Sequence, residues 1–265
     1  MPYGQTMKRA TLPLLAMLAG FALPALAGEI PPDEKRSGFD FMSRENQAMQ
    51  RDDTANPGIL WVRDGEALWN RKAGAEGRSC ADCHGAASSS MRGVAARYPA
   101  FDEKRNRPVT LEQRIRICRE TNQNATPLDW ESDALLALTA YVAFQSRGMN
   151  VAPPDDERLA PFRENGRLLF HQRQGQLDFA CSDCHDDNWG RHLAGSVIPQ
   201  AHPTGYPLYR LEWQDMGSLQ RRLRNCMTGV RAEPYPVGAP EYVDLELFLM
   251  DRARGLPLET PAVRP

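Results

Sequence analysis

The chain has few residues that commonly bind metals or act as nucleophiles: its 265 residues include only six cysteines and five histidines. Opposite charges nearly cancel, and the formal net charge of −2 argues against a general nucleic-acid binder. After residue 27, no apolar run approaches the roughly 20 residues needed to cross a bilayer. Strand patterns are weak in both halves. The sequence therefore argues against nucleic-acid-binding and membrane-spanning proteins, and each cysteine and histidine can be considered individually.

The apolar run at the start of the chain is typical of an export signal. Lys8 and Arg9 precede a run from Thr11 to Leu26, and Ala25-Leu26-Ala27 offers small residues for cleavage. We predict a signal peptide over residues 1–27. The alternative, a membrane anchor, is disfavoured because the run has about 16 residues, whereas a span needs roughly 20. The mature protein is therefore expected in the periplasm, where thiols tend to oxidise.

Four of the six cysteines lie in two C-x-x-C-H motifs, Cys80–His84 and Cys181–His185. This spacing is the attachment signature of c-type haem. Two thiols one turn apart reach both haem vinyl groups, and the adjacent histidine becomes the proximal iron ligand. A zinc or disulfide cluster is the alternative, but a structural zinc site does not require a histidine directly after each second cysteine. The motifs predict two covalent haem c groups, held by Cys80, Cys83, Cys181 and Cys184, with His84 and His185 as iron ligands.

The two motifs belong to an internal repeat. Gly65 and Gly166 each precede a motif by fifteen residues, and the segment 111–118 aligns with 219–226. Each half ends in an apolar helical pattern, and a charged, proline-containing segment separates the halves. We predict an all-α fold of two tandem cytochrome-c-like domains, preceded by an extended N-terminal arm. The expected boundaries are arm 28–57, first domain 58–150, linker 151–161, second domain 162–256 and C-terminal tail 257–265.

Each haem iron needs a second axial ligand, and the first half offers few candidates. No further histidine lies between His84 and the linker, which leaves Met91, Met149 and Cys118. Met91 is close to His84 in sequence and Met149 follows the closing helix, whereas Cys118 lies in mid-domain. In the second half the candidates are His192, His202, Met216, Met227, Met250 and Cys226. Only cysteine occurs at matched positions, which predicts Cys118 and Cys226 as the axial ligands.

The alternative role for these two cysteines is a disulfide between them, because exported proteins rarely leave thiols free. A disulfide requires Cα atoms within about 7 Å, and equivalent positions of two domains normally lie farther apart.

Cys226 also has a cationic neighbour. Arg222 precedes it by four residues, so on a helix the guanidinium and the sulfur share one face. Positive charge favours the thiolate, which is the nucleophilic form of cysteine. Arg114 holds the equivalent place before Cys118, and for it we favour the neutralisation of a haem propionate. The chemistry is therefore expected at Cys226.

Together these residues resemble the SoxA family, the dihaem subunits of the SoxAX cytochromes of bacterial thiosulfate oxidation. The resemblance covers essentially the whole mature chain. It includes the arm from Met49 to Trp61, both haem motifs, Asn225-Cys226-Met227, the run from Arg231 to Tyr235 and the closing segments 245–249 and 252–255. Some members of the family lack the first haem, and this chain keeps its motif.

The resemblance implies an L-cysteine S-thiosulfotransferase, which joins thiosulfate oxidatively to a cysteine of the carrier SoxYZ. It implies a heterodimer with the monohaem cytochrome SoxX and electron transfer to a small c-type cytochrome. It further implies that Cys226 ligates haem and carries a persulfide, that Arg222 binds substrate and that Cys118 ligates the other haem.

Two other functions remain open from the residues alone. One is a dihaem periplasmic electron carrier without catalysis of its own. The other is a dihaem peroxidase, which needs an open haem and is disfavoured by a matched sixth ligand in both halves.

Overall fold

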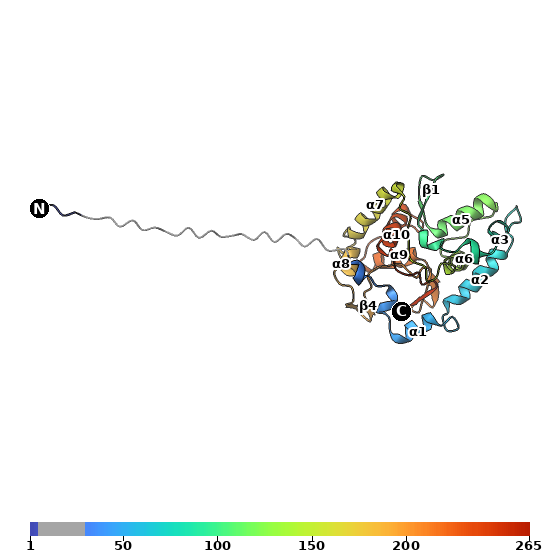
Figure 1. Cartoon of the computed structure of the whole chain (residues 1–265), viewed down its shortest axis with the longest axis horizontal. Coiled ribbons are helices and arrows are strands. Elements are labelled where there is room, and N and C mark those ends of the chain that lie inside the picture. Colours follow the sequence, from blue (N-terminus) through green and yellow to red (C-terminus); the bar gives the residue numbers. More distant parts are fainter. Residues whose placement is uncertain (5–29) are drawn as a thin grey trace.

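The computed structural model describes residues 1–4 and 30–265, which are drawn in colour in Figure 1. The predicted signal peptide lies outside the described residues, apart from residues 1–4. Within the described part of the chain, no helix is long and apolar enough to cross a membrane.

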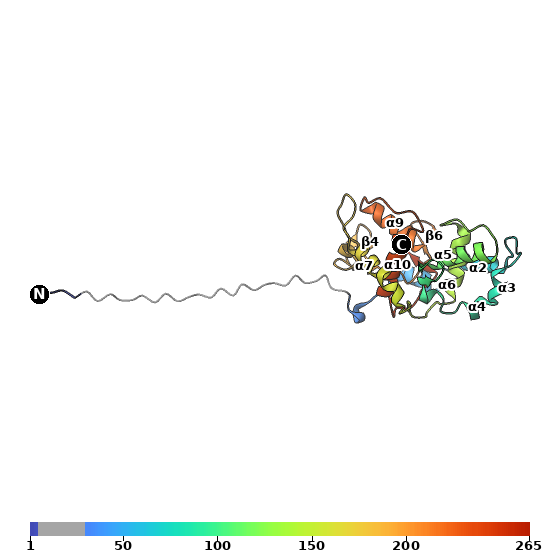
Figure 2. The same ribbon diagram turned by 90° about the horizontal axis from the view of Figure 1, so that it is seen from above.

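Apart from the short helix α4, the two halves have the same succession of helices around their haem motifs. The first half contains α2 (Gly58–Asn70), α3 (Cys80–His84), α4 (Ala87–Ser90), α5 (Leu111–Asn122) and α6 (Asp133–Phe144). The second half contains α7 (Ala160–His171), α8 (Cys181–His185), α9 (Leu219–Gly229) and α10 (Pro240–Arg252). Figures 1 and 2 show the two sets side by side, with α2 and α3 at one end and α7 and α8 at the other. Single 3₁₀ turns, η3 (Ala95–Arg97) and η4 (Glu157–Leu159), lie between the helices.

A glycine in each half allows the first and last helices of that half to pack closely. A Cβ atom at Gly65 in α2 would overlap the carbonyl oxygen of Ala137 in α6. In the same way, a Cβ atom at Gly166 in α7 would overlap the carbonyl oxygen of Asp244 in α10. Both overlaps are with backbone, which cannot rotate away. The repeated glycine fifteen residues before each motif is therefore a packing requirement.

Short strands follow each haem motif, and the prediction of an all-α fold is wrong in this respect. The strands are β1 (Ala100–Asp102), β2 (Arg107–Val109), β3 (His192–Leu193), β4 (Ser196–Val197), β5 (Leu208–Arg210), β6 (Asp215–Gly217) and β7 (Ala262–Arg264). β1 pairs with β2 and β3 with β4, both antiparallel. The third sheet has the order β6-β5-β7, in which β7 is parallel to β5. Strands of two or three residues are too short to show an alternating pattern in sequence.

The segment before α2 is not the extended arm that the sequence predicted. It contains η1 (Pro32–Glu34), η2 (Gly38–Phe41) and α1 (Arg44–Arg51). The side-chain oxygen of Gln50 accepts the Val263 N–H at 3.0 Å, and Asn56 donates to the Pro261 carbonyl at 2.9 Å. The arm therefore crosses to the C-terminal segment, and Figure 1 shows α1 beside the C-terminus. A largely polar eight-residue helix gives little periodic signal.

The two halves share a hydrophobic core. One cluster joins Trp69 and Leu138 of the first half to Met250 and Leu258 of the second. The linker takes part, because Val151 is only 1% exposed and its N–H donates to the Leu256 carbonyl at 2.8 Å. The halves are thus packed against each other, and residues of both can reach a common site.

Candidate functional site

Each haem motif forms a short helix that starts at its first cysteine. Ser79 caps α3, and the Asp82 carboxylate accepts the Ser79 N–H at 2.8 Å. At α8 the Asp183 carboxylate accepts the Ala180 N–H at 3.0 Å. The aspartate inside each motif therefore stabilises the helix that holds both cysteines and the histidine in register.

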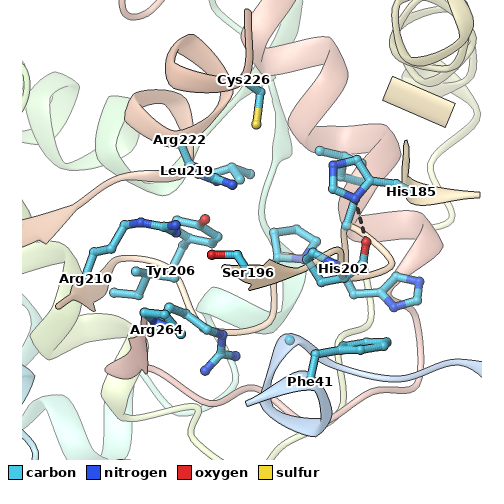
Figure 3. A pocket seen from close by; sticks show the side chains of 18 of the residues that line it. Phe41, His185, Ser196, His202, Tyr206, Arg210, Leu219, Arg222, Cys226 and Arg264 are labelled. Atoms are coloured by element: carbon cyan, nitrogen blue, oxygen red, sulfur yellow. Dashed lines mark hydrogen bonds between the residues drawn. The ribbon is translucent and has the colours of Figure 1, made fainter. Parts of the chain in front are cut away.

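In the second half the structure brings His185 and Cys226 together across a pocket (Figure 3). The His185 Nδ1 atom lies 2.6 Å from the Pro199 carbonyl oxygen, and the His185 ring lines the same pocket as the Cys226 sulfur. A carbonyl that fixes one nitrogen of a ligating histidine is a common arrangement at metal sites. A nitrogen donor facing a sulfur donor, next to the thiols Cys181 and Cys184, fits a covalently held haem iron.

His185 and Cys226 both line this pocket, which is partly open to solvent. Its walls come from several parts of the chain: α9 and β5 of the second half, Phe41 and Met42 of the arm, Ser196 and Val197 of the β3–β4 hairpin, and Arg264 of β7. The arm and the C-terminal strand, far apart in sequence, thus enclose the second haem motif.

Cys226 differs from the motif cysteines in its pKa. Burial alone would raise the pKa of the Cys226 thiol, but the hydrogen bond from His185 and the charge of Arg222 lower it to about 7. Burial raises the pKa of Cys181 to about 12, and it also raises the pKa values of Cys80 and Cys184. The site therefore stabilises a thiolate at Cys226, which is the form that binds iron and attacks sulfur.

Arg222, next to Cys226, lacks the acidic salt-bridge partner that its counterpart Arg114 has in the first half. There the Arg114 guanidinium forms a salt bridge with the buried Asp102 carboxylate at 2.7 Å. This arginine is therefore neutralised by a carboxylate of the same chain. The position of Asp102, the last residue of β1, corresponds to Arg210 at the end of β5. Arg222 forms no salt bridge with any described residue, and Arg210 pairs only with the exposed Glu212, at 3.1 Å. Arg210 and Arg222 therefore line one pocket together with Arg264, which is paired with Glu259, and this arrangement suits an anion.

The first half is arranged differently around its motif. Cys83 and His84 are exposed, and the His84 ring lies against Trp69 with ring centroids 5.7 Å apart. Burial and the nearby Cys118 both raise the pKa of Cys80, which places Cys118 beside the motif. The Asn122 amide donates to the Cys118 sulfur at 3.4 Å. All six cysteines are unbonded, so Cys118 and Cys226 do not form the alternative disulfide.

The other candidate iron ligands of the second half are engaged elsewhere. His192 is exposed in β3, Met216 is fully buried in a cluster with Ile59, and Met250 belongs to the shared core. Met227 accepts a hydrogen bond from the Tyr242 hydroxyl at 3.3 Å. Cys226 is the candidate that faces His185.

His202, one of the candidate iron ligands predicted from the sequence, also lines this pocket. It is 8% exposed, its Nδ1 atom lies 2.7 Å from the Arg36 carbonyl, and burial lowers its pKa to about 4. Its position depends on the arm, so no local signal could reveal it. Arg210, by contrast, could have been found by extending the repeat alignment back to Asp102.

Comparisons with known proteins agree with this arrangement. The profile of the SoxA/TsdA cytochrome c domain matches residues 64–151 and 165–258, and each match contains one haem motif. The L-cysteine S-thiosulfotransferase subunit SoxA of Rhodovulum sulfidophilum is 37% identical over 232 residues, which cover 88% of this chain and 81% of that protein. The chain belongs to the SoxA family. SoxA of Pseudaminobacter salicylatoxidans is 39% identical over 235 residues, covering 88% of this chain and 82% of that protein.

A solved structure extends the comparison to the fold. The crystal structure of SoxXA from P. pantotrophus superimposes with a TM-score of 0.84 at 32% identity, and the match covers 87% of each chain. The SoxA fold therefore extends over most of the chain. The prediction of two cytochrome c domains is confirmed, and such domains bind haem c covalently.

Proposed function

We propose that this chain is the catalytic subunit of an L-cysteine S-thiosulfotransferase and that Cys226 is its catalytic residue. The single observation that carries the proposal is the pocket in which Cys226 faces His185 and is flanked by the unneutralised Arg222. Relatives that carry this activity in their names support it. A simple electron carrier has no need of an anion-binding arginine beside an iron ligand.

The proposed site residues follow the repeat. Two haem c groups are held by thioether bonds to Cys80, Cys83, Cys181 and Cys184. His84 with Cys118 would coordinate the iron in the first half, and His185 with Cys226 would do so in the second. The proposed domains are 58–150 and 162–256, with 28–57 as the arm, 151–161 as the linker and 257–265 as the tail.

The reaction joins a thiosulfate dianion to a carrier thiolate, and the new sulfur–sulfur bond releases two electrons. Haem c, when bound, supplies the one-electron acceptors that this oxidation requires. Arg222 binds the sulfonate end of thiosulfate through its planar fork of N–H donors, which matches paired oxygens. Arg210 adds a second positive charge from the same pocket wall. Two anionic sulfur compounds repel each other in water. The two arginines reduce this repulsion, so the compounds can approach each other in the pocket.

Cys226 carries the reacting sulfur as a persulfide. Its terminal sulfur and the terminal sulfur of thiosulfate form a bond as two electrons leave, which gives a sulfonate chain on Cys226. The carrier thiolate then attacks the former thiosulfate sulfur, takes the thiosulfate unit and returns the persulfide anion to Cys226. Arg222 stabilises the negative charge on Cys226 at the beginning and the end of this cycle.

The partners follow from the relatives. One solved relative is a SoxXA complex, which supports a SoxX-like monohaem cytochrome c as the heterodimer partner. A SoxYZ-like protein serves as the carrier substrate, and a small c-type cytochrome removes the electrons. The predicted signal peptide and the chemistry of covalent haem support a periplasmic location.

Mass spectrometry of the carrier protein tests the proposal against the electron-carrier alternative. The purified complex is mixed with thiosulfate, carrier and an oxidised c-type cytochrome. We expect one thiosulfonate adduct on the carrier cysteine for every two electrons delivered. Reduction of the cytochrome without any adduct would favour the electron carrier. The intact mass of this chain reports the number of haems and any sulfur added to Cys226.

A further inference from the structure

The helix that presents Arg222 and Cys226 begins differently from its counterpart in the first half. At the start of α5, the Thr110 hydroxyl accepts the Gln113 N–H at 3.2 Å. The Gln113 side chain in turn accepts the Thr110 N–H at 2.9 Å. In this reciprocal capping box, the side chains of the first turn accept the N–H groups of Thr110 and Gln113. Helix α5 therefore needs no other residue to fix its N-terminus.

Helix α9 can form only half of such a box by itself. The Ser218 hydroxyl accepts the Arg221 N–H at 3.1 Å, but a guanidinium has no acceptor to offer in return. Arg221 instead donates to Asp215 at 3.2 Å and lies over the Trp213 ring. The missing acceptor comes from the first half, where the Glu131 carboxylate accepts the Ser218 N–H at 3.4 Å and the Ser218 hydroxyl.

Glu131 also supplies the negative charge that the α9 N-terminus lacks. The first turn of α9 has no acidic residue, whereas α5 has Glu112 there. Arg221 and Arg222 add positive charge to the end of the helix that already carries the positive pole of the dipole. A carboxylate at this point offsets both contributions.

The loop that carries Glu131 is fixed between the two halves. Glu131 has a left-handed backbone, with φ of 57°, which non-glycine residues seldom adopt. Its neighbour Trp130 packs against Gly238, where even a Cβ atom would lie 2.5 Å from the indole ring. Arg116 lies over the same ring at 4.5 Å. The surrounding contacts therefore hold Glu131 in an unfavourable conformation that points its side chain at α9.

We propose that Glu131 is a positioning residue, through which the first domain closes the cap of the catalytic helix and fixes Arg222 relative to Cys226. The Arg222 N–H donates to the Ser218 carbonyl at 3.3 Å, so the first turn that Glu131 stabilises includes Arg222 itself. The inference rests on the proposed roles of Arg222 and Cys226. It gives the first domain a part in the reaction that does not depend on its own haem.

Three variants of the holo complex with its partner cytochrome test this role. Glu131→Ala removes the acceptor, and we expect kcat/KM for thiosulfate to fall about tenfold, as a lost helix cap can cause. Glu131→Gln keeps an oxygen for the Ser218 N–H and loses the charge and the second acceptor, which serves the Ser218 hydroxyl, so a decrease of about threefold is expected. In the Glu131→Ala background, the additional change Arg221→Gln gives α9 a capping box like that of α5. It should therefore recover most of the lost kcat/KM. The single variant Arg221→Gln shows what its own contacts contribute.

Gln113→Ala is the matched control: it opens the equivalent cap of α5, removes the 3.4 Å hydrogen bond from the Gln113 amide to the Gly238 carbonyl, and should leave turnover unchanged. Electron paramagnetic resonance of the oxidised protein provides a readout without turnover: Glu131→Ala should shift the signal of the second haem, and Gln113→Ala should not. This shift remains measurable even if Cys226 is not catalytic. Wild-type turnover and spectrum in Glu131→Ala would overturn the proposal, as would equal losses in Glu131→Ala and Glu131→Gln with no rescue by Arg221→Gln.

Discussion

The two halves of the chain place an arginine and a cysteine at the same positions of one helix, yet only one half leaves the arginine available. In the first half, the buried Asp102 carboxylate pairs with the partly exposed Arg114. In the second half Arg210 stands where Asp102 would be, and Arg222 forms no salt bridge with any described residue. A single change of charge sign in a short strand thus separates a structural arginine from one that can bind an anion.

The halves also differ in how their haem motifs are covered. The segment between the motif histidine and the following Tyr-Pro pair is seven residues longer in the second half (185 to 206, against 84 to 98). It contains the β3–β4 hairpin, whose Ser196 and Val197 line the pocket. The arm and β7 complete the enclosure. An enclosed pocket strengthens electrostatic interactions with bound anions, whereas an exposed motif suits electron transfer.

The largest effect is expected when the two cysteines proposed as axial ligands, Cys118 and Cys226, are replaced by methionine one at a time. Cys226→Met should abolish thiosulfate transfer, because a thioether cannot carry a bridging sulfur. Cys118→Met should alter a haem spectrum and leave substantial activity. Steady-state turnover and visible spectra of both holo complexes measure this. Comparable activity in the two variants would remove Cys226 from its catalytic role.

The next largest effect is expected at Arg222. Arg222→Ala should lose about 2–4 kcal/mol of transition-state stabilisation, roughly a hundredfold or more in kcat/KM. Arg222→Lys keeps the charge without the fork and should also weaken catalysis clearly. Haem incorporation should be intact, since no covalent or axial ligand changes. Arg114→Ala is the internal control with little expected effect, and equal losses in the two alanine variants would contradict a special role for Arg222.

Arg210→Asp gives the second half the acidic residue that the first half has at the equivalent position, Asp102. The new carboxylate should pair with Arg222 and repel a dianion, so KM for thiosulfate should rise by about tenfold or more. Glu212→Gln is the control, because it removes the exposed salt-bridge partner of Arg210 and leaves both arginines in place. An unchanged KM in Arg210→Asp would show that the charge difference between the halves does not determine anion binding.

The smallest effect on turnover is expected from Asp102→Asn. Burial would raise the pKa of Asp102, but the Arg105 N–H and Arg114 lower it below its ordinary range. A lowered pKa stabilises the fold above the ordinary value near 3.9, and this stabilisation is lost as pH falls through the lowered pKa. The variant should lose about 1–3 kcal/mol of unfolding free energy near neutral pH and keep its turnover. Thermal unfolding that is unchanged would contradict the structural role of this pair.

The sequence alone predicted the parts of the site that depend on covalent spacing. Two thiols and a histidine must keep the C-x-x-C-H spacing to hold haem, so Cys181 and His185 were recognisable without a structure. Helical periodicity placed Arg222 and Cys226 on one face, and the structure confirms that both line one pocket. These features are local, which is why they can be read from a sequence.

What the sequence did not reveal depends on contacts between distant segments. The strands are too short to show an alternating pattern of apolar residues, and β7 is recognisable as a strand only from its pairing with β5. The Phe41 and His202 side chains reach the pocket because the arm folds across the second half. Glu131 reaches Ser218 from 87 residues away, and nothing near either residue in the sequence indicates this contact.

Electron paramagnetic resonance of the oxidised holo protein tests the central claim most directly. The account predicts low-spin signals of thiolate-ligated haem from both halves, of which the signal lost in Cys226→Met is the one that changes when thiosulfate is added. Spectra assignable only to haems with histidine and methionine ligands would contradict the assignment of Cys118 and Cys226. A thiosulfate response that persists in Cys226→Met would place the reaction at another site.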